Sequence, residues 1–360
     1  MHRLDRIIID ECHIVLNDQA DFRPQMQQLG QLMVAKTQMV LLTATLPPTD
    51  EEVLFQRMRC RREDVSMFRA RTVRPNIAYR VVRPVVDGQY ANPRRWIQMP
   101  VVADTVRERI RHAKPGKVVV YAQVVSHALE MAEILGCEAY FHDQVDKAGI
   151  LERFIAGNQR VIVATSAIGI GLDIPDIRSI IHLGIPRSLR DYAQESGRAG
   201  RDGKPSEAII VVPQLMDQIP PWFDSQPSSL LDQERVRRYM QVGEGYMPRC
   251  RRIVLDEYLD GIIDRYVRQC CGDRDAQEIL CDGCHGDWEA EESVGQSVSQ
   301  VDSPPVSQSE QEMSDRQVDG DHESIHTVDS NSIANESSGL SVRTEDHRIG
   351  SPASLWNSAD

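Results

Sequence analysis

Long apolar stretches are absent from this sequence. The isoleucine triplet at residues 7–9 is flanked by charged residues, and no run approaches the roughly 20 apolar residues that a membrane-spanning helix needs. The N-terminus also lacks the basic and apolar regions of a secretory signal peptide. We therefore expect an intracellular protein without a membrane partner.

Aromatic residues are scarce, at 5% of the chain. The hydrophobic share of 41% and the charged share of 26% are nevertheless ordinary for a soluble globular protein. At 360 residues the chain is long enough for about two domains.

The phosphate-binding pattern G-x-x-x-x-G-K followed by Ser or Thr is also absent. Gly116-Lys117-Val118 and Gly203-Lys204-Pro205 contain the Gly-Lys pair, but neither the spacing nor the hydroxyl. Because the backbone N–H groups of such a loop hold nucleotide phosphates, we expect this chain to hold a nucleoside triphosphate poorly on its own.

The net charge of −13 is concentrated in one segment. Residues 286–360 contain 16 acidic and 3 basic residues, so the rest of the chain carries 38 of each sign. The segment is rich in Ser, Asp, Glu and Gln and cannot bury enough apolar surface to offset the entropy of ordering it. We predict a disordered acidic tail that is open to protein partners, and a neutral body that argues neither for nor against nucleic acid.

Short apolar runs alternate with amphipathic helical segments along the body. Gly136 and Gly157 each follow a predicted helix and are expected to end it. Strands that alternate with helices imply right-handed crossovers and a parallel sheet with helices on both faces. The patterns predict strands at 7–9, 39–45, 118–121, 139–141, 161–165, 179–183 and 208–212, and helices at 101–113, 126–135 and 146–155.

Two carboxylates follow the first predicted strand. Asp10 and Glu11 stand at its carboxyl end, where open α/β sheets bind ligands. Asp10 can hold Mg²⁺, and Glu11 can orient or deprotonate an attacking water. Thr43 and Thr45 end the next predicted strand and can relay between the carboxylates and a second domain. Acidic residues and hydroxyls are also common at strand ends without any site, so this interpretation depends on the rest of the chain.

Two arginines three positions apart, Arg198 and Arg201, are separated by Ala199 and Gly200. On a helical turn this spacing puts both guanidiniums on one face. Guanidiniums are planar, permanently charged donors that suit phosphate oxygens. The segment is therefore a candidate pair of arginine fingers for a γ-phosphate, and its alternative is a surface loop that makes ion pairs.

A glycine-containing loop leaves the strand predicted at 161–165. Thr165 can hydrogen-bond a nucleic-acid phosphate, and Gly169 and Gly171 let backbone N–H groups reach a phosphate. Asp173 can link this loop to a nucleotide site. A single Gly-x-Gly is a weak signal by itself, because turns need glycine anyway.

Taken together, these segments resemble the RecQ-like DNA helicases of superfamily 2. Asp10-Glu11-Cys12-His13 is similar to the DExH box of that family, and Asp21-Phe22-Arg23-Pro24 and Leu42-Thr43-Ala44-Thr45 are similar to the sequence after it. The Gly169–Gly171 loop and the segment from Gln194 to the two arginines resemble motifs V and VI. The chain departs from the family at Asp18 and Ala20, where Trp and His are usual.

The resemblance implies an ATP- and Mg²⁺-dependent 3′–5′ helicase that acts on single-stranded DNA or duplex junctions in DNA repair and recombination. It would be located in the nucleus or, in a prokaryote, in the nucleoid or cytoplasm. The resemblance also implies roles for particular residues. The catalytic residues would be Asp10, Glu11, His13, Gln194, Arg198 and Arg201; the nucleotide-binding residues Thr43, Thr45, Gly171 and Asp173; and the DNA-binding residues Phe22, Arg23, Thr165 and Gly169.

Five of the eight cysteines cluster late in the body, at positions 250, 270, 271, 281 and 284. Without a secretion signal, clustered cysteines indicate a metal before disulfides. The zinc subdomain of the RecQ-like helicases occupies this place and begins with a similar Cys-Arg-Arg. We predict a tetrahedral structural Zn²⁺ site, with Cys270 and His285 left as alternative ligands to the set Cys250, Cys271, Cys281 and Cys284.

The expected architecture is α/β: a partial RecA-like domain over residues 1–70, a second RecA-like domain over 71–214, a small helical zinc-binding subdomain over 215–285 and the tail. One alternative is a catalytically inactive remnant that binds nucleic acid or a partner. Another is an RNA helicase of the DEAD or DExH kind, against which the Thr-Ala-Thr element and the cysteines count.

Overall fold

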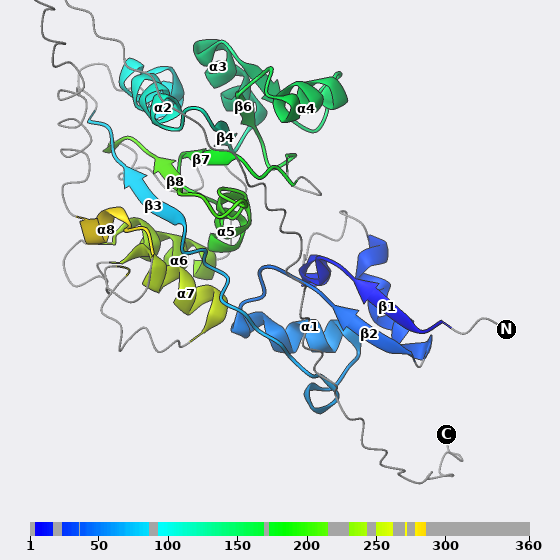
Figure 1. The fold of residues 1–360 in the computed structure, drawn as a ribbon. Helices are drawn as coiled ribbons and strands as arrows, with labels where there is room; N and C mark the ends of the chain where they lie inside the picture. Colours follow the sequence, from blue (N-terminus) through cyan, green and yellow to red (C-terminus); the bar gives the residue numbers. More distant parts are fainter. Residues whose placement is uncertain are drawn as a thin grey trace, which may run out of the picture. The chain divides into compact units, whose positions relative to one another are not determined.

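The computed structural model describes residues 4–16, 24–35, 37–85, 93–168, 173–214, 230–242, 250–261, 271 and 278–285. These residues all fall within one compact unit, Met1–Val301. Their strands form two parallel sheets, one of order β1-β2 and one of order β3-β8-β7-β4-β6-β5 (Figure 1). None of the helices in the described ranges has the length and apolar character needed to cross a membrane.

The two-stranded sheet pairs β1 (Arg6–Ile9) with β2 (Gln38–Leu41). The second strand ends at Leu41, four residues before the predicted end at residue 45, although the Leu42 N–H still bonds the Ile9 carbonyl at 2.9 Å. Four helical segments surround the sheet: η1 (Cys12–Leu16), η2 (Pro24–Ala35), η3 (Pro48–Asp50) and α1 (Glu51–Met58). They close a core of Ile9, Cys12, Val15, Leu46, Leu54 and Met58.

The six-stranded sheet contains the main core. Strand β4 lies between β7 and β6, and all six of its residues are buried, which explains its continuous apolar run. The strands predicted in this part of the chain are confirmed. The strands of this sheet are β3 (Ile77–Val82), β4 (Lys117–Ala122), β5 (Glu138–Tyr140), β6 (Val161–Ala164), β7 (Ile177–Leu183) and β8 (Ser206–Val211).

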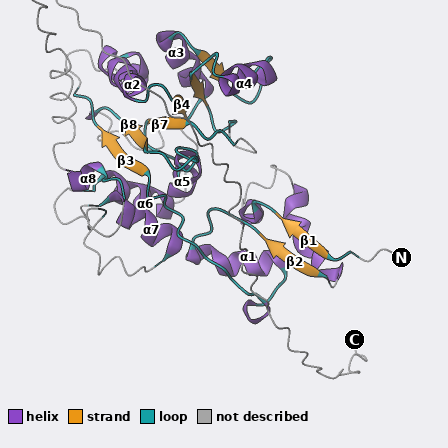
Figure 2. Cartoon of the chain, in the orientation of Figure 1, coloured by secondary structure: helices purple, strands orange, loops and turns teal. Residues whose placement is uncertain are grey.

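Helices cover both faces of this sheet (Figure 2). The three predicted helices are confirmed, and Gly136 (φ 65°) and Gly157 (φ 84°) end two of them in the left-handed conformation that glycine favours. Residues 93–98 form a 3₁₀ helix that the sequence patterns did not predict. The helices between β3 and β8 are η5 (Pro93–Gln98), α2 (Pro100–His112), α3 (Val125–Leu135), α4 (Lys147–Ala156) and α5 (Leu189–Ser196), and η4 (Arg62–Asp64) precedes β3.

The sequence patterns did not predict β3 or α6 (Leu230–Met240). Strand β3 contains Arg80, which interrupts its apolar run and lies 3.9 Å from Glu207 of β8. A strand that is stabilised partly by a half-buried ion pair has neither an unbroken apolar run nor a clean alternation, so its local signal is weak.

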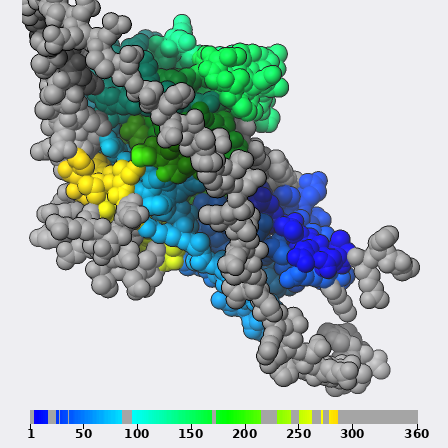
Figure 3. Space-filling view, viewed as in Figure 1, coloured from blue at the N-terminus to red at the C-terminus, as the bar shows by residue number. Residues whose placement is uncertain are grey.

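Helices α6, α7 (Arg251–Asp260) and α8 (Asp282–His285) complete the described chain. Figure 3 shows the yellow C-terminal segment against the light-blue segment that includes β3. Strand β3 is an outer strand of the six-stranded sheet, and its Val81 N–H donates to Asp282 Oδ2 at 2.8 Å. The segment of α8 thus supplies a hydrogen-bond acceptor to a backbone group at the edge of the sheet. The domain boundaries at 70, 214 and 285 stay predictions, and the predicted tail lies outside the described residues.

Candidate nucleotide site and cysteine cluster

The two carboxylates follow β1 directly, as the sequence predicts. Glu11 has a positive φ of 52°, a conformation that non-glycine residues rarely adopt, and its N–H donates to Asp10 Oδ1 at 2.9 Å. Burial and the neighbouring Asp10 raise the pKa of Glu11, while Arg198 and Arg201 act in the opposite direction. The positive charges of both guanidiniums of the arginine turn therefore act on the carboxylate of Glu11.

A hydrogen-bond network joins the carboxylate segment to the segment before the arginine turn. His13 Nδ1 lies 3.0 Å from Thr43 Oγ1 and 3.2 Å from Glu11 Oε2. Gln194 Nε2 lies 2.8 Å from His13 Nε2 and donates to Thr45 Oγ1 at 2.8 Å. The side-chain amide of Gln194 thus bonds two residues, His13 and Thr45, that precede it by 181 and 149 positions in the chain.

The protonation state of His13 follows from this geometry. Burial, followed by the charge of Arg190, lowers the pKa of His13 to about 4, so the ring is neutral at neutral pH. Because the amide of Gln194 donates, His13 Nε2 accepts, and the ring proton then lies on Nδ1. From Nδ1 it can be donated toward Thr43 or Glu11.

The arginine turn follows α5 rather than lying on it. Helix α5 ends at Ser196, and Arg198 and Arg201 lie in the turns beyond it, where both line one small hollow beside Tyr121. Arg201 Nη1 bonds Asp173 Oδ1 at 2.9 Å. Burial and the Glu195 charge raise the pKa of Tyr121, whereas Arg198 opposes this shift.

Gly200 is required in this turn. Its φ is 58°, and a Cβ there would lie 2.5 Å from Asn76 Nδ2 and 2.8 Å from the Lys204 carbonyl oxygen. Asn76 Nδ2 itself donates to the carbonyls of Gly200 and Lys204 at 2.8 Å each. The turn is thus held against the segment that leads into β3.

Sequence reasoning also missed further contacts between residues that lie far apart in the chain. Arg190 of α5 forms an ion pair with Asp50. Arg69 donates to the Leu46 carbonyl at 2.8 Å and to the Leu259 carbonyl at 3.1 Å. These partners are between 23 and 190 positions apart, so no local pattern could have signalled them.

Four of the predicted site residues, Phe22, Arg23, Gly169 and Gly171, lie outside the described residues. Thr165 immediately follows β6, where its N–H donates to the Tyr140 carbonyl at 3.0 Å and its Oγ1 accepts from Ala167 at 3.4 Å.

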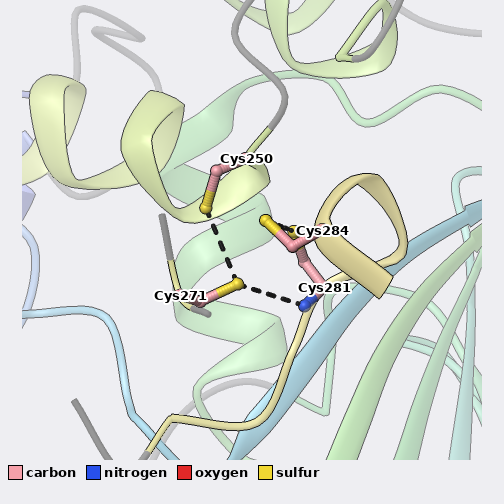
Figure 4. A group of neighbouring side chains, drawn as sticks. All are labelled: Cys250, Cys271, Cys281 and Cys284. Carbon is pink, nitrogen blue, oxygen red and sulfur yellow. Dashed lines mark hydrogen bonds between the residues drawn. The ribbon is translucent and has the colours of Figure 1, made fainter. Parts of the chain in front are cut away.

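The predicted cysteine ligands come together. The sulfur atoms of Cys250, Cys271, Cys281 and Cys284 all lie within 4.8 Å of one another. Figure 4 shows them converging from the start of α7, from residue 271 and from α8. The Sγ atoms of Cys250 and Cys271 are 3.7 Å apart, and those of Cys281 and Cys284 are 3.4 Å apart. Tetrahedral coordination with metal–sulfur bonds of about 2.3 Å places sulfur atoms about 3.8 Å apart, so the cluster has the dimensions of a four-thiolate metal site.

The surroundings of the sulfur atoms also suit thiolates. The Arg251 N–H donates to Cys281 Sγ at 3.4 Å, and the Cys281 N–H donates to Cys271 Sγ at 3.3 Å. Hydrogen bonding among the four thiols lowers the pKa of Cys250 and Cys281 and raises the pKa of Cys271 and Cys284. Of the two alternative ligands, His285 is exposed next to Cys284, and Cys270 lies outside the described residues.

Comparisons with known proteins agree with this geometry. Residues 101–203 match the family described as Helicase conserved C-terminal domain. RecQ-like DNA helicase blm-1 of Caenorhabditis elegans is 30% identical over 224 residues, which is 59% of this chain and 21% of that protein. Probable ATP-dependent DNA helicase RecS of Bacillus subtilis is 31% identical over 215 residues, or 57% of this chain and 40% of that protein. ATP-dependent DNA helicase RecQ of Pasteurella multocida is 29% identical over 272 residues, or 70% and 39%.

The fold and the match define the class first: an α/β protein with a six-stranded parallel sheet, of which residues 101–203 match a helicase C-terminal domain, followed by a four-cysteine cluster. More particularly, the chain is a relative of the RecQ-like DNA helicases, as its similarity of about 30% to several of them shows. The chain spans less than half the length of these curated relatives.

Proposed function

We propose that this chain supplies motor elements of a RecQ-like DNA helicase, an enzyme that couples ATP hydrolysis to 3′–5′ unwinding of DNA. The observation that carries the proposal is the bridge from Gln194 to His13 and Thr45. It joins the segment with the paired carboxylates to the segment with the paired arginines, and a phosphoryl-transfer site needs both.

In the proposed site, ATP and Mg²⁺ lie between these two segments. Asp10 would hold the Mg²⁺, and Glu11 would orient the attacking water and accept its proton. The water oxygen bonds the γ-phosphorus as the bond to the β–γ bridging oxygen breaks, and ADP leaves. Arg198 and Arg201 stabilise the charge on the transferred phosphoryl oxygens. A raised pKa makes Glu11 a better proton acceptor than an ordinary carboxylate.

The bridge supplies the coupling in this proposal. Gln194 would report whether the two segments are closed, because its amide bonds His13 and Thr45 of the other segment. His13 in turn faces Glu11, so closure fixes the orientation of the carboxylate that handles the water. Asp173 holds Arg201 until the phosphate is present.

DNA is the proposed polymer substrate, held through its backbone with little reading of bases. Thr165 would contact a phosphate at the carboxyl end of β6, together with the predicted contacts from Gly169, Phe22 and Arg23. The cysteine cluster would hold a structural Zn²⁺, which contributes folding energy and no catalytic group.

A second candidate function is a catalytically inactive module that binds DNA or a partner protein. The observation that favours it is the absence of the phosphate-binding pattern from the printed sequence. Both candidates use the same fold, and they differ only in turnover.

The deciding experiment measures ATP hydrolysis by residues 1–360 with and without single-stranded DNA. We expect a slow, DNA-stimulated rate that Glu11→Ala removes. The matched control is Glu63→Ala, an exposed carboxylate of the same type in η4, which should leave the rate unchanged. A rate equal to that of Glu11→Ala, with DNA binding retained in a fluorescence anisotropy assay, would exclude the motor and favour the module.

A further inference from the structure

A groove of about 620 Å³ lies where the ends of α2 and α3 meet the start of β6. Helices α2 and α3 pack against each other on this side of the six-stranded sheet (Figure 1). Val161 opens β6 at the groove, whereas Thr165 follows the other end of that strand, so the groove and the proposed DNA contact lie at opposite ends of β6. Its lining residues are Asp104, Arg107, Ile110, Arg111, Lys114, Leu135 and Val161.

Three basic residues line the groove, and only one of them is paired with a carboxylate of the described residues. Arg107 bonds Asp104 Oδ1 at 3.0 Å and the Ile134 carbonyl, near the end of α3, at 2.9 Å. Arg111 and Lys114 are exposed, and neither side chain has a hydrogen-bond or ion-pair partner within the part of the chain that the structure describes. The groove therefore offers two unpaired cations on one side.

The floor of the groove is aliphatic. Ile110, Leu135 and Val161 each remain partly accessible there, although they pack against the main core. An apolar floor beside unpaired cations is complementary to a ligand that carries both carboxylates and aliphatic side chains. A nucleic-acid backbone fits less well, because it has no aliphatic groups for the floor.

We propose that this groove is a docking site for an acidic peptide segment of a partner protein, with carboxylates against Arg111 and Lys114 and an aliphatic side chain on Leu135 and Val161. The simpler role of the two cations is to complement the C-terminal end of α2. That role predicts an effect on stability alone, whereas docking predicts an effect on binding.

The first test is fluorescence polarisation with a labelled peptide of alternating Glu and Leu residues, titrated with residues 1–360. We expect the double variant Arg111→Glu/Lys114→Glu to bind about tenfold more weakly or worse, since both attractions become repulsions. The matched control is Arg237→Glu, a charge reversal on the exposed face of α6, which should change binding by less than about twofold. Circular dichroism checks that each variant folds. Equal binding by the double variant would overturn the proposal.

The second test concerns the floor. An all-Glu peptide should bind more weakly than the Glu/Leu peptide, and Leu135→Gln should weaken only the latter. Equal binding of the two peptides would show a general anion-binding surface instead of a peptide groove. An oligothymidylate that binds more tightly than the peptide, and loses its affinity in the double variant, would show a nucleic-acid site. Either result would overturn the inference, and neither depends on ATP turnover.

Discussion

His13 illustrates how burial sets the chemistry of a single side chain. Its neutral ring has one acceptor nitrogen, which Gln194 uses, and one donor nitrogen, which faces Thr43 and Glu11. Protonation would convert the acceptor into a second donor and break the bond from Gln194. The bridge between the two segments is therefore sensitive to pH through one ring.

The pH dependence of stability should reflect this ring. Because the pKa of His13 is lowered to about 4 in the folded chain, the unfolded chain binds a proton there first as pH falls from about 6.5 to about 4, and stability falls with pH through this window. We expect His13→Gln to remove this contribution in urea unfolding at several pH values. His142→Gln, at a side chain that is 88% exposed, is the matched control. An NMR titration midpoint near 6.5 for His13 would contradict the prediction.

Alanine substitutions at two glycines near the arginines can separate the effect of steric crowding on stability from the effect of backbone strain. Gly200→Ala combines a positive φ with a Cβ 2.5 Å from Asn76 Nδ2, whereas Gly203→Ala has a φ of 80° and no atom within 4 Å. We expect a loss of unfolding free energy of about 1 kcal/mol for Gly203→Ala and of about 2–4 kcal/mol for Gly200→Ala. Thermal unfolding measures both. Equal losses would show that the space around Gly200 can adjust.

Strand β3 depends on a buried charge for its position. The guanidinium of Arg252 in α7 is fully buried and donates to the carbonyls of Arg74, Pro75 and Ile279 at 2.6, 3.1 and 3.0 Å. It also lies 3.8 Å from the buried Glu278. One side chain thus connects the segment before β3, α7 and the segment before α8.

We expect Arg252→Met to destabilise the chain by about 3–5 kcal/mol, because it leaves a carboxylate and several carbonyls without their donor. Arg237→Met, on an exposed ion pair in α6, should change the stability by no more than about 0.5 kcal/mol. Urea unfolding of both variants is the measurement. A small loss for Arg252→Met would mean that water replaces the guanidinium.

What the sequence predicts depends on whether the signal is local. Strand β4, the glycine stops of α3 and α4, and the four cysteines are each marked by a short pattern, and the structure confirms these elements and the cysteine cluster. The placement of the arginines three apart is also local, although they lie in turns after α5 instead of on a helix.

The features that were missed are tertiary. Strand β3 contains Arg80, whose place in a buried strand is explained by its ion pair with Glu207 of β8. The ion pair of Arg190 with Asp50 joins residues that are 140 positions apart. The partners of Gln194 are equally remote, so sequence alone marks it as a motif residue without showing what it binds. These contacts become visible only when the segments are brought together.

At the level of the whole described chain, the cysteine cluster should control the outer edge of the six-stranded sheet. Asp282, which accepts from the Val81 N–H, lies between two of the predicted ligands, Cys281 and Cys284. Removal of the proposed zinc with a chelator should release α8 and expose this amide.

We therefore expect hydrogen exchange at the Val81 amide to accelerate by about tenfold or more after chelation, while the Val119 amide of the central strand β4 keeps its protection. Re-addition of zinc should restore the slow rate, and mass spectrometry counts the bound metal. Unchanged exchange at Val81 would show that the cluster and the sheet edge are independent.

The two edges of the six-stranded sheet differ in one further respect. On one side, β5 has only three residues and offers a short row of backbone groups. On the other side, β3 has six residues, and it is the side chain of Asp282 that bonds the Val81 N–H there. An uncovered strand of that length can pair with strands of other molecules. We therefore expect the segment that carries the cysteines also to protect this protein from self-association, and chains stripped of the proposed zinc to aggregate before the central sheet unfolds.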